Sequence, residues 1–193
     1  ELARNDLEAA AQEATRGIDV LARFVPLGEE EATLRSSLAG LYDSRGASLE
    51  RLRRHQEAEH DHGIALALRA SLAHDFPATA QYRYLVACSF NNLAMARNEL
   101  GDPNGAIDLY ADAVERFRQA TRMSQKRVDY ASGLVTTLQN LAQLLQVQRR
   151  WDELAVRIDE LVAVATDPQS SLLAARLTVK LAAAIRGRGE PDA

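Results

Sequence analysis

Three side chains in the first half of the sequence have the spacing of a metal site. His55, Glu59 and His62 are four and then three residues apart, so one face of a helix would carry all three. Imidazole and carboxylate groups are ligands that Zn²⁺ and similar ions accept. A shift of the sequence by 48 residues, however, aligns His62 with Tyr110 and Ile158, which belong to an apolar stripe. We therefore interpret these side chains as packed or solvated, and we expect no metal and no other cofactor.

Two groups of arginines could contact phosphate. Arg51, Arg53 and Arg54 form one group, and Arg149 and Arg150 form the other. The chain as a whole carries 27 acidic and 23 basic residues, which gives a net charge of −4, whereas nucleic-acid binding calls for a basic surface. We therefore expect these arginines to lie in ordinary solvated turns, and we predict no nucleic-acid partner.

The sequence shows no arrangement typical of an enzyme. It has no nucleophile elbow, no Cys–His pair and no carboxylates paired at a recognisable spacing. The one cysteine, Cys88, has no histidine close in sequence and is interpreted as a small core or rim residue. No apolar run is long enough to span a bilayer, so we predict no membrane insertion of this segment. Because the chain begins at Glu1 rather than methionine, we expect a fragment or a processed chain.

The elements that would position a binding site are all predicted to be helices. Ten glycines and five prolines interrupt the chain sparsely, and no segment alternates as a strand does. The predicted helices cover residues 2–25, 29–52, 56–75, 79–100, 103–123, 128–148, 151–165 and 170–185. The turn at Arg53 and Arg54 lacks glycine, so one continuous helix through it is an alternative.

The apolar pattern of these helices returns every 48 residues. Around Gly101, Asp102 and Pro103 the chain has the signals that end one helix and begin the next. A 48-residue shift places further residues of the same kind at equivalent positions: Ala58, Ala106 and Leu154; Ala65, Ala113 and Leu161; Gly46, Ala94 and Ala142; Leu66, Val114 and Val162. Three helical hairpins of about 20 residues per helix therefore follow one another, and stacking them would bury the face that one hairpin cannot cover.

In length and pattern, residues 87–120 resemble a tetratricopeptide repeat. Leu93, Ala94 and Ala106 stand where that family keeps its aliphatic and small residues. The resemblance implies an all-α fold, a right-handed α-solenoid of antiparallel helix hairpins. We expect one domain over residues 1–193, with parts assigned as an N-terminal helix in 1–28, repeats in 29–77, 78–125 and 126–168, and a capping helix in 169–188.

A narrower resemblance is carried by residues 1–26 and 58–94. They resemble the helical repeat region that follows the kinase domain in many large bacterial serine/threonine protein kinases. The matching positions are Ala65, Leu66, Leu68, Arg69, Leu72, Pro77, Tyr82, Arg83, Asn91, Asn92 and Leu93. Arg53 and Arg149 depart from that family, which usually has glycine there. The resemblance implies a non-catalytic regulatory or scaffolding arm of a kinase, which could itself be membrane-anchored, since the segment contains no kinase motifs.

The predicted binding residues come from the first helix of each hairpin, which lines the concave groove in tetratricopeptide stacks. Asp43, Ala47, Glu50, Cys88 and Thr136 share this stripe, and the residues predicted to bind are Asn91, Met95, Asn98, Gln139, Gln143 and Gln146. Carboxamides both donate and accept hydrogen bonds, so they suit the backbone of a bound peptide. A lysine and arginine clamp for a C-terminal carboxylate is missing from these positions, so that ligand is not predicted. The alternatives are a merely solvated face and a domain that self-associates through an exposed apolar stripe on a terminal helix.

Overall fold

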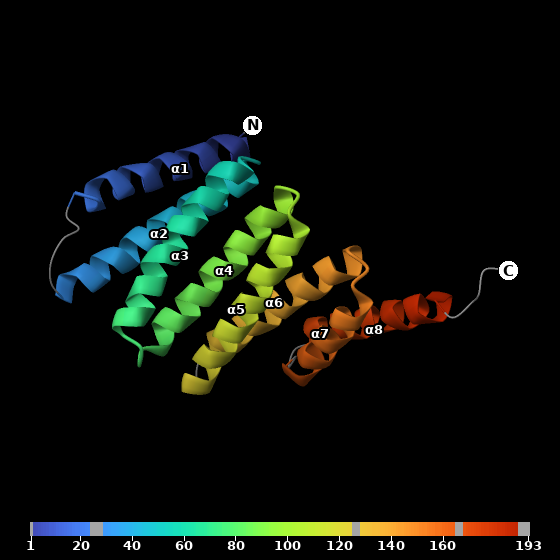
Figure 1. Cartoon of the computed structure of the whole chain (residues 1–193). Helices are drawn as coiled ribbons and strands as arrows, with labels where there is room; N and C mark the ends of the chain where they lie inside the picture. The colour runs from blue at the N-terminus through green and yellow to red at the C-terminus, as the bar shows by residue number, and fades with distance from the viewer. Residues whose placement is uncertain (1, 24–28, 125–127, 165–167, 189–193) are drawn as a thin grey trace. The chain divides into compact units, whose positions relative to one another are not determined.

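The computed structural model describes residues 2–23, 29–124, 128–164 and 168–188, and every regular element in these ranges is an α-helix (Figure 1). The chain forms two compact units, Glu1–Ser124 and Gln125–Ala193. Unit 1 contains α1 (Leu2–Leu21), α2 (Glu29–Arg51), α3 (His55–Asp75), α4 (Ala80–Glu99) and α5 (Pro103–Met123). Unit 2 contains α6 (Val128–Val147), α7 (Trp151–Val164) and α8 (Pro168–Arg188). The single domain expected over the whole chain stays a prediction.

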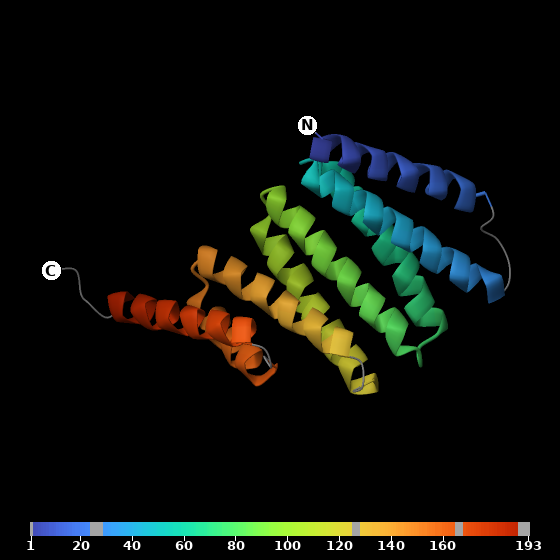
Figure 2. The same ribbon diagram turned by 180° about the vertical axis from the view of Figure 1, so that it is seen from behind.

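Within each unit, helices that follow one another in the chain pack together. In unit 1 each of the helices α1 to α4 contacts the next, and in unit 2 α7 contacts both α6 and α8, which also touch each other. Figure 2 shows α2 and α4 lying in front of α3 and α5, so α2 to α5 alternate between two layers. This succession of antiparallel hairpins confirms the predicted fold class, an all-α structure of the solenoid type.

Most predicted helix ends agree with the structure to within one or two residues. The largest difference is at α1, which ends at Leu21, whereas the sequence pattern extended it to residue 25. At the other end of the chain, α8 begins at Pro168 rather than residue 170, because proline suits the first turn of a helix, where its missing amide hydrogen has no partner to lose.

The turns that close the hairpins share one backbone geometry. Arg53, Gly101 and Arg149 all have positive φ, at 61°, 83° and 56°. The same two hydrogen bonds form around each, as at Arg53, where the amide of Arg54 donates to the carbonyl of Leu49 at 2.8 Å and that of Arg53 to Glu50 at 2.9 Å. This is the Schellman arrangement, which ends a helix in a left-handed residue. The alternative of one continuous helix through residues 53 and 54 was therefore wrong.

Two of these turns hold arginine in a conformation that favours glycine. A residue with a Cβ atom destabilises the folded chain by about 1–2 kcal/mol when it is left-handed. Glycine avoids this cost, but its greater flexibility in the unfolded chain offsets about 0.5–1 kcal/mol of the gain. We expect Arg53→Gly and Arg149→Gly each to raise the free energy of unfolding by about 0.5–1 kcal/mol, as measured by urea denaturation followed by circular dichroism.

The reverse change supplies the control for the turn geometry. Gly101→Ala should lower the free energy of unfolding by about 1 kcal/mol, because Gly101 has a φ of 83°. Gly63→Ala should raise it by a similar amount, because Gly63 lies inside α3 with open space where its Cβ would stand. A loss of stability in Arg53→Gly would contradict the interpretation.

The burial of side chains follows the 48-residue repeat. The equivalent residues Ala58, Ala106 and Leu154 are all fully buried. Two further sets are buried as well, which are Ala65, Ala113 and Leu161, and His62, Tyr110 and Ile158. The apolar stripes predicted from the sequence are therefore the packed faces of α3, α5 and α7.

Several positions differ from the predicted stripes, which also included Leu100 at the end of α4 and Ala10 on α1. Val162 is 60% exposed, although its equivalent Val114 is buried. The buried residues of α7 are Leu154, Ile158 and Leu161. Leu100 is exposed at the end of α4, where it is the last residue before the turn. On α1, Ala11 rather than Ala10 is buried.

Candidate functional site

The predicted binding residues of α4 lie on its solvent side. Met95 and Asn98 are exposed and Asn91 is half-buried. The amide nitrogen Nδ2 of Asn91 donates to Oδ1 of Asn92 at 3.5 Å and contacts Sδ of Met95 at 3.8 Å. Met95 therefore presents a flexible apolar side chain between two carboxamides, and such a surface can adapt to a peptide.

On α2 the residues at the equivalent positions mostly face the interior of unit 1 instead. Asp43 and Glu50 occupy the repeat positions of Asn91 and Asn98, but both carboxylates point toward α3 and are largely buried. Only Ala47 of the three predicted residues on this helix is exposed. The carboxamide surface of unit 1 is thus carried by α4.

A buried polar network joins α2, α3 and α4. Oδ1 of Asp43 lies 2.9 Å from Nδ1 of His62, and Oδ2 accepts from Nη1 of Arg69. Nη1 of Arg69 also donates to Oγ of Ser89 at 2.7 Å. Burial raises the pKa of Asp43, but the hydrogen bond with His62 and the charge of Arg69 lower it by more, so the net pKa is below the usual value. Buried networks of this kind specify how helices align.

A second carboxylate, that of Glu50, lies beside His62 of the same network. Nε2 of His62 and Oε1 of Glu50 face each other at 3.7 Å, and neither of these two described atoms makes a hydrogen bond. Burial raises the pKa of Glu50, since a desolvated carboxylate is disfavoured in its charged form. The ring of His62 also lies against Gly46, where an added Cβ would come within 2.7 Å of it.

The three residues with metal-site spacing do not converge. His55 lies 3.9 Å from Glu99 on α4, Glu59 pairs with Arg97, and His62 belongs to the buried network. Across the parts of the chain that the structure describes, no group of three or more His, Cys, Asp or Glu residues could hold a metal ion. The packing of His62 on the apolar stripe, predicted from the repeat, is confirmed.

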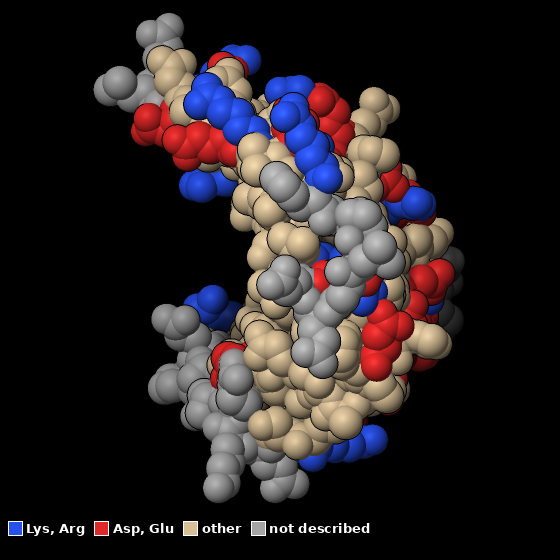
Figure 3. All heavy atoms as spheres, turned by 90° about the vertical axis from the view of Figure 1, so that its left-hand side faces the viewer, with Lys and Arg blue, Asp and Glu red and all other residues tan. Residues whose placement is uncertain are grey.

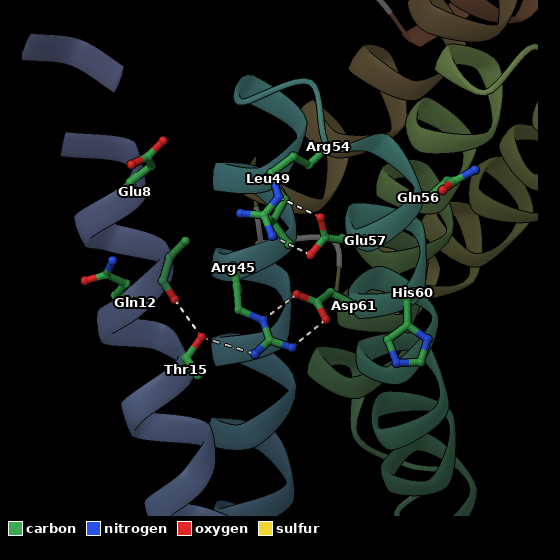
Figure 4. Close-up of a pocket in the computed structure, with 11 residues that line it drawn as sticks. Glu8, Gln12, Thr15, Arg45, Leu49, Arg54, Gln56, Glu57, His60 and Asp61 are labelled. Atoms are coloured by element: carbon green, nitrogen blue, oxygen red, sulfur yellow. Dashed lines mark hydrogen bonds and ion pairs between the residues drawn. The ribbon is translucent and has the colours of Figure 1, made fainter. Parts of the chain in front are cut away.

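A pocket of about 620 Å³ opens between α1, α2 and α3 (Figure 4). On its floor Arg45 donates to both carboxylate oxygens of Asp61, at 2.7 and 2.8 Å, and to Oγ1 of Thr15 at 3.2 Å. At its upper edge Arg54 makes a two-pronged pair with Glu57, at 2.6 and 2.5 Å. Because both guanidinium groups are already paired, neither is free for a ligand. The pair of Arg45 with Asp61 fastens α2 to α3, and its bond to Thr15 connects α1 to them.

One arginine at each of the Arg53 and Arg149 turns is paired in the same way, while Arg51, Arg53 and Arg149 are exposed. Arg150 contacts Glu153 at 2.6 and 2.7 Å, repeating the pair of Arg54 with Glu57 one position after the left-handed residue. On the face seen in Figure 3, basic side chains alternate with acidic ones and do not gather into a patch. Cys88 is half-buried, and burial raises the pKa of its thiol, which disfavours the reactive thiolate. Among the described helices, none has the length and apolar character needed to cross a bilayer.

In unit 2 two predicted residues line a pocket. Gln143 and Gln146 of α6 form one wall of an opening of about 570 Å³, and α8 supplies the rest through Leu173, Ala175, Arg176, Leu177, Val179 and Lys180. Nζ of Lys180 donates to Oε1 of Gln146 at 3.4 Å. Gln139 is half-buried further along α6. Sequence reasoning assigned no binding role to the cations of α8, for which the available signal was a helix of 21 residues that contains no Asp or Glu.

The comparisons with known proteins concern the fold. The family model of the tetratricopeptide repeat matches residues 86–121, which lie within the α4–α5 hairpin, and the predicted resemblance of this segment to that repeat is confirmed. Among solved structures the chain is similar to the crystal structure of BtubC (BKLC) from P. vanneervenii, at 18% identity over 97% of this chain and 94% of that one, with a TM-score of 0.55. A search of curated proteins gave no match. The likeness to the repeat region of bacterial kinases stays a prediction.

Proposed function

We propose that this chain is a non-catalytic module that binds a segment of a protein or peptide through Asn91, Met95 and Asn98 of α4 and Gln139, Gln143 and Gln146 of α6. Tetratricopeptide repeats generally mediate protein–protein interaction, and residues 86–121 match that family. The observation that carries the proposal is the position of carboxamides on the solvent side of both helices, 48 residues apart. Such groups can satisfy the donors and acceptors of a peptide backbone without selecting one side chain.

The chain would act as the regulatory or scaffolding arm of a larger protein, for which a bacterial serine/threonine kinase is our candidate. What supports this part of the proposal is the sequence resemblance of residues 1–26 and 58–94. Arg69 is one of the matching residues, and it has a structural role in this chain. It holds α3 to α2 through Asp43 and to α4 through Ser89.

A peptide library displayed on phage and selected against the whole chain tests the proposal. For the tightest peptide obtained, we expect the double variants Asn91→Ala/Met95→Ala and Gln139→Ala/Gln143→Ala each to weaken binding at least about tenfold, which corresponds to about 1.4 kcal/mol. Isothermal titration calorimetry measures the affinities.

The matched control is Asp112→Ala, which changes an exposed residue of α5 in the other layer of unit 1. It should bind the peptide as the original chain does. Double variants that bind with unchanged affinity, or a selection that yields no peptide, would remove these faces from the function.

Self-association is a second candidate, favoured by one observation. Unit 2 exposes several large apolar side chains, which are Val147, Val156, Val162, Leu172 and Val179. Single exposed apolar residues are common on protein surfaces. Here α7 and α8 each carry two of them, and a terminal helix with an exposed apolar stripe is the feature that the sequence interpretation associated with a self-associating domain.

A further inference from the structure

The exposed side of α7 alternates acidic and apolar residues. Asp152, Val156, Asp159 and Ala163 are spaced four, three and four residues apart and are all exposed, so they form one stripe. Among the described residues, neither Asp152 nor Asp159 has an ion-pair partner, whereas Glu160 is paired with Arg157 at 2.8 Å. The two free carboxylates thus flank the half-exposed side chain of Val156.

The exposed side of α8 has the opposite arrangement at the same spacing. Leu172, Arg176 and Val179 are separated by four and three residues and are all exposed, and Lys180 stands beside them. Here the apolar side chains flank the cation. α8 contains no Asp or Glu and α6 contains only Asp129 near its start. Among the described residues that line the pocket between these helices, Arg176 and Lys180 are basic and none is acidic, so its rim is positive.

The structure assigns the pocket between α6 and α8 to α7 of a second copy of this chain. Asp159 of one copy would meet Arg176 and Lys180 of its neighbour, while Val156 would meet the apolar wall formed by Leu173 and Val179. The inference deepens the proposed function. It rests on that function in one respect, which is that Gln143 and Gln146 are part of a binding surface. The α4 surface has no part in it.

The contact has a definite symmetry. Its two halves are different patches of one unit, so a copy that uses its pocket still offers its own α7, and the association is head-to-tail. The molar mass should therefore rise steadily with concentration unless the rotation closes a ring. Charge pairs at a rim are screened by salt, so the same association should weaken as the ionic strength increases.

Reversal of charge on either side tests the assignment in the whole chain. Light scattering should give a mass above the 21.2 kDa of one chain at high concentration. The pocket variant Arg176→Glu/Lys180→Glu and the helix variant Asp152→Asn/Asp159→Lys should each weaken self-association by about tenfold or more. Circular dichroism verifies that the helical content of both is unchanged.

Mixing the two variants gives the decisive result. The reversed pocket fits the reversed α7 and the two unchanged halves fit each other, so the mixture should recover the original mass. As a control, Arg116→Glu on the exposed side of α5 should self-associate like the original chain. A chain that remains monomeric at every concentration, even if it binds a selected peptide in the pocket, overturns the assignment. So does a mixture that stays monomeric.

These outcomes are separate from those of the peptide experiment. Loss of peptide binding in Asn91→Ala/Met95→Ala with unchanged mass concerns the α4 surface alone. Restoration of mass in the mixture establishes the α6–α8 pocket whether or not any peptide binds α4.

Discussion

Replacement of Asp43 with alanine is expected to lower the free energy of unfolding by about 3–5 kcal/mol. The change removes the acceptor of both Arg69 and His62, and both of these side chains are buried. Arg69 would keep only its bond to Ser89, leaving a charge in the interior with no counter-charge beside it. Urea denaturation of the whole chain, followed by circular dichroism, measures the loss.

Two variants serve as controls for Asp43. Asp43→Asn keeps one oxygen acceptor and should lose less than the alanine variant, since part of the hydrogen bonding survives. Asp112→Ala, an exposed site, should change stability by no more than about 0.5 kcal/mol. If Asp43→Ala were as mild as Asp112→Ala, the network would have no structural role.

The effect of Asp43 should also depend on pH. Because its pKa is lowered in the folded state, its contribution is present above the usual carboxyl pKa and is lost as the pH falls through the folded value. The alanine variant lacks this part of the acid dependence, so its difference from the original chain should shrink in acid. Glu50 acts in the opposite sense: its raised pKa gives a contribution that is present in acid and lost as the pH rises through the folded value.

Truncation of Phe117 is expected to have an effect of similar size. Phe117→Ala should lower the free energy of unfolding by about 3–5 kcal/mol, because the ring is only 2% exposed and packs edge-on against Tyr84 with ring centres 5.6 Å apart. The contact joins α4 to α5, so the loss measures the packing of the α4–α5 hairpin itself. Thermal and urea denaturation both report it.

Phe76 offers the matched control for this truncation. Its ring also lies 5.6 Å from a tyrosine, Tyr82, but it is 40% exposed in the connection after α3. Phe76→Ala should therefore cost only about 1 kcal/mol. Equal losses at the two positions would show that the α4–α5 stripe is not the packed face.

The helices and their packed faces were predictable because each depends on local spacing. Small or apolar residues at Ala58, Ala106 and Leu154 recur with the repeat, and a buried face must be apolar wherever it lies. The turn at Arg53 was harder, because arginine has no intrinsic preference for a left-handed conformation. There the tertiary packing of α2 against α3 decides the backbone, and the sequence left a continuous helix as an alternative.

The polar interior and the pocket of unit 2 depend on contacts that spacing does not reveal. Asp43 was placed on the solvent stripe with Asn91, although His62 and Arg69 on the buried side of α3 required an acidic partner. Similarly, α6 alone indicated a surface of carboxamides. The cations beside it come from α8, whose position against Gln146 follows from the fold of unit 2 and not from any period in the sequence.

The shared geometry of the turns makes the array modular in a practical sense. Residues 54–101 begin directly after one left-handed residue and end on the next, since Arg53 and Gly101 close their helices with the same hydrogen bonds. A duplicate of this segment inserted after Gly101 would enter and leave through turns that the protein already makes. The array could thus be lengthened by one α3–α4 pair without designing a new joint.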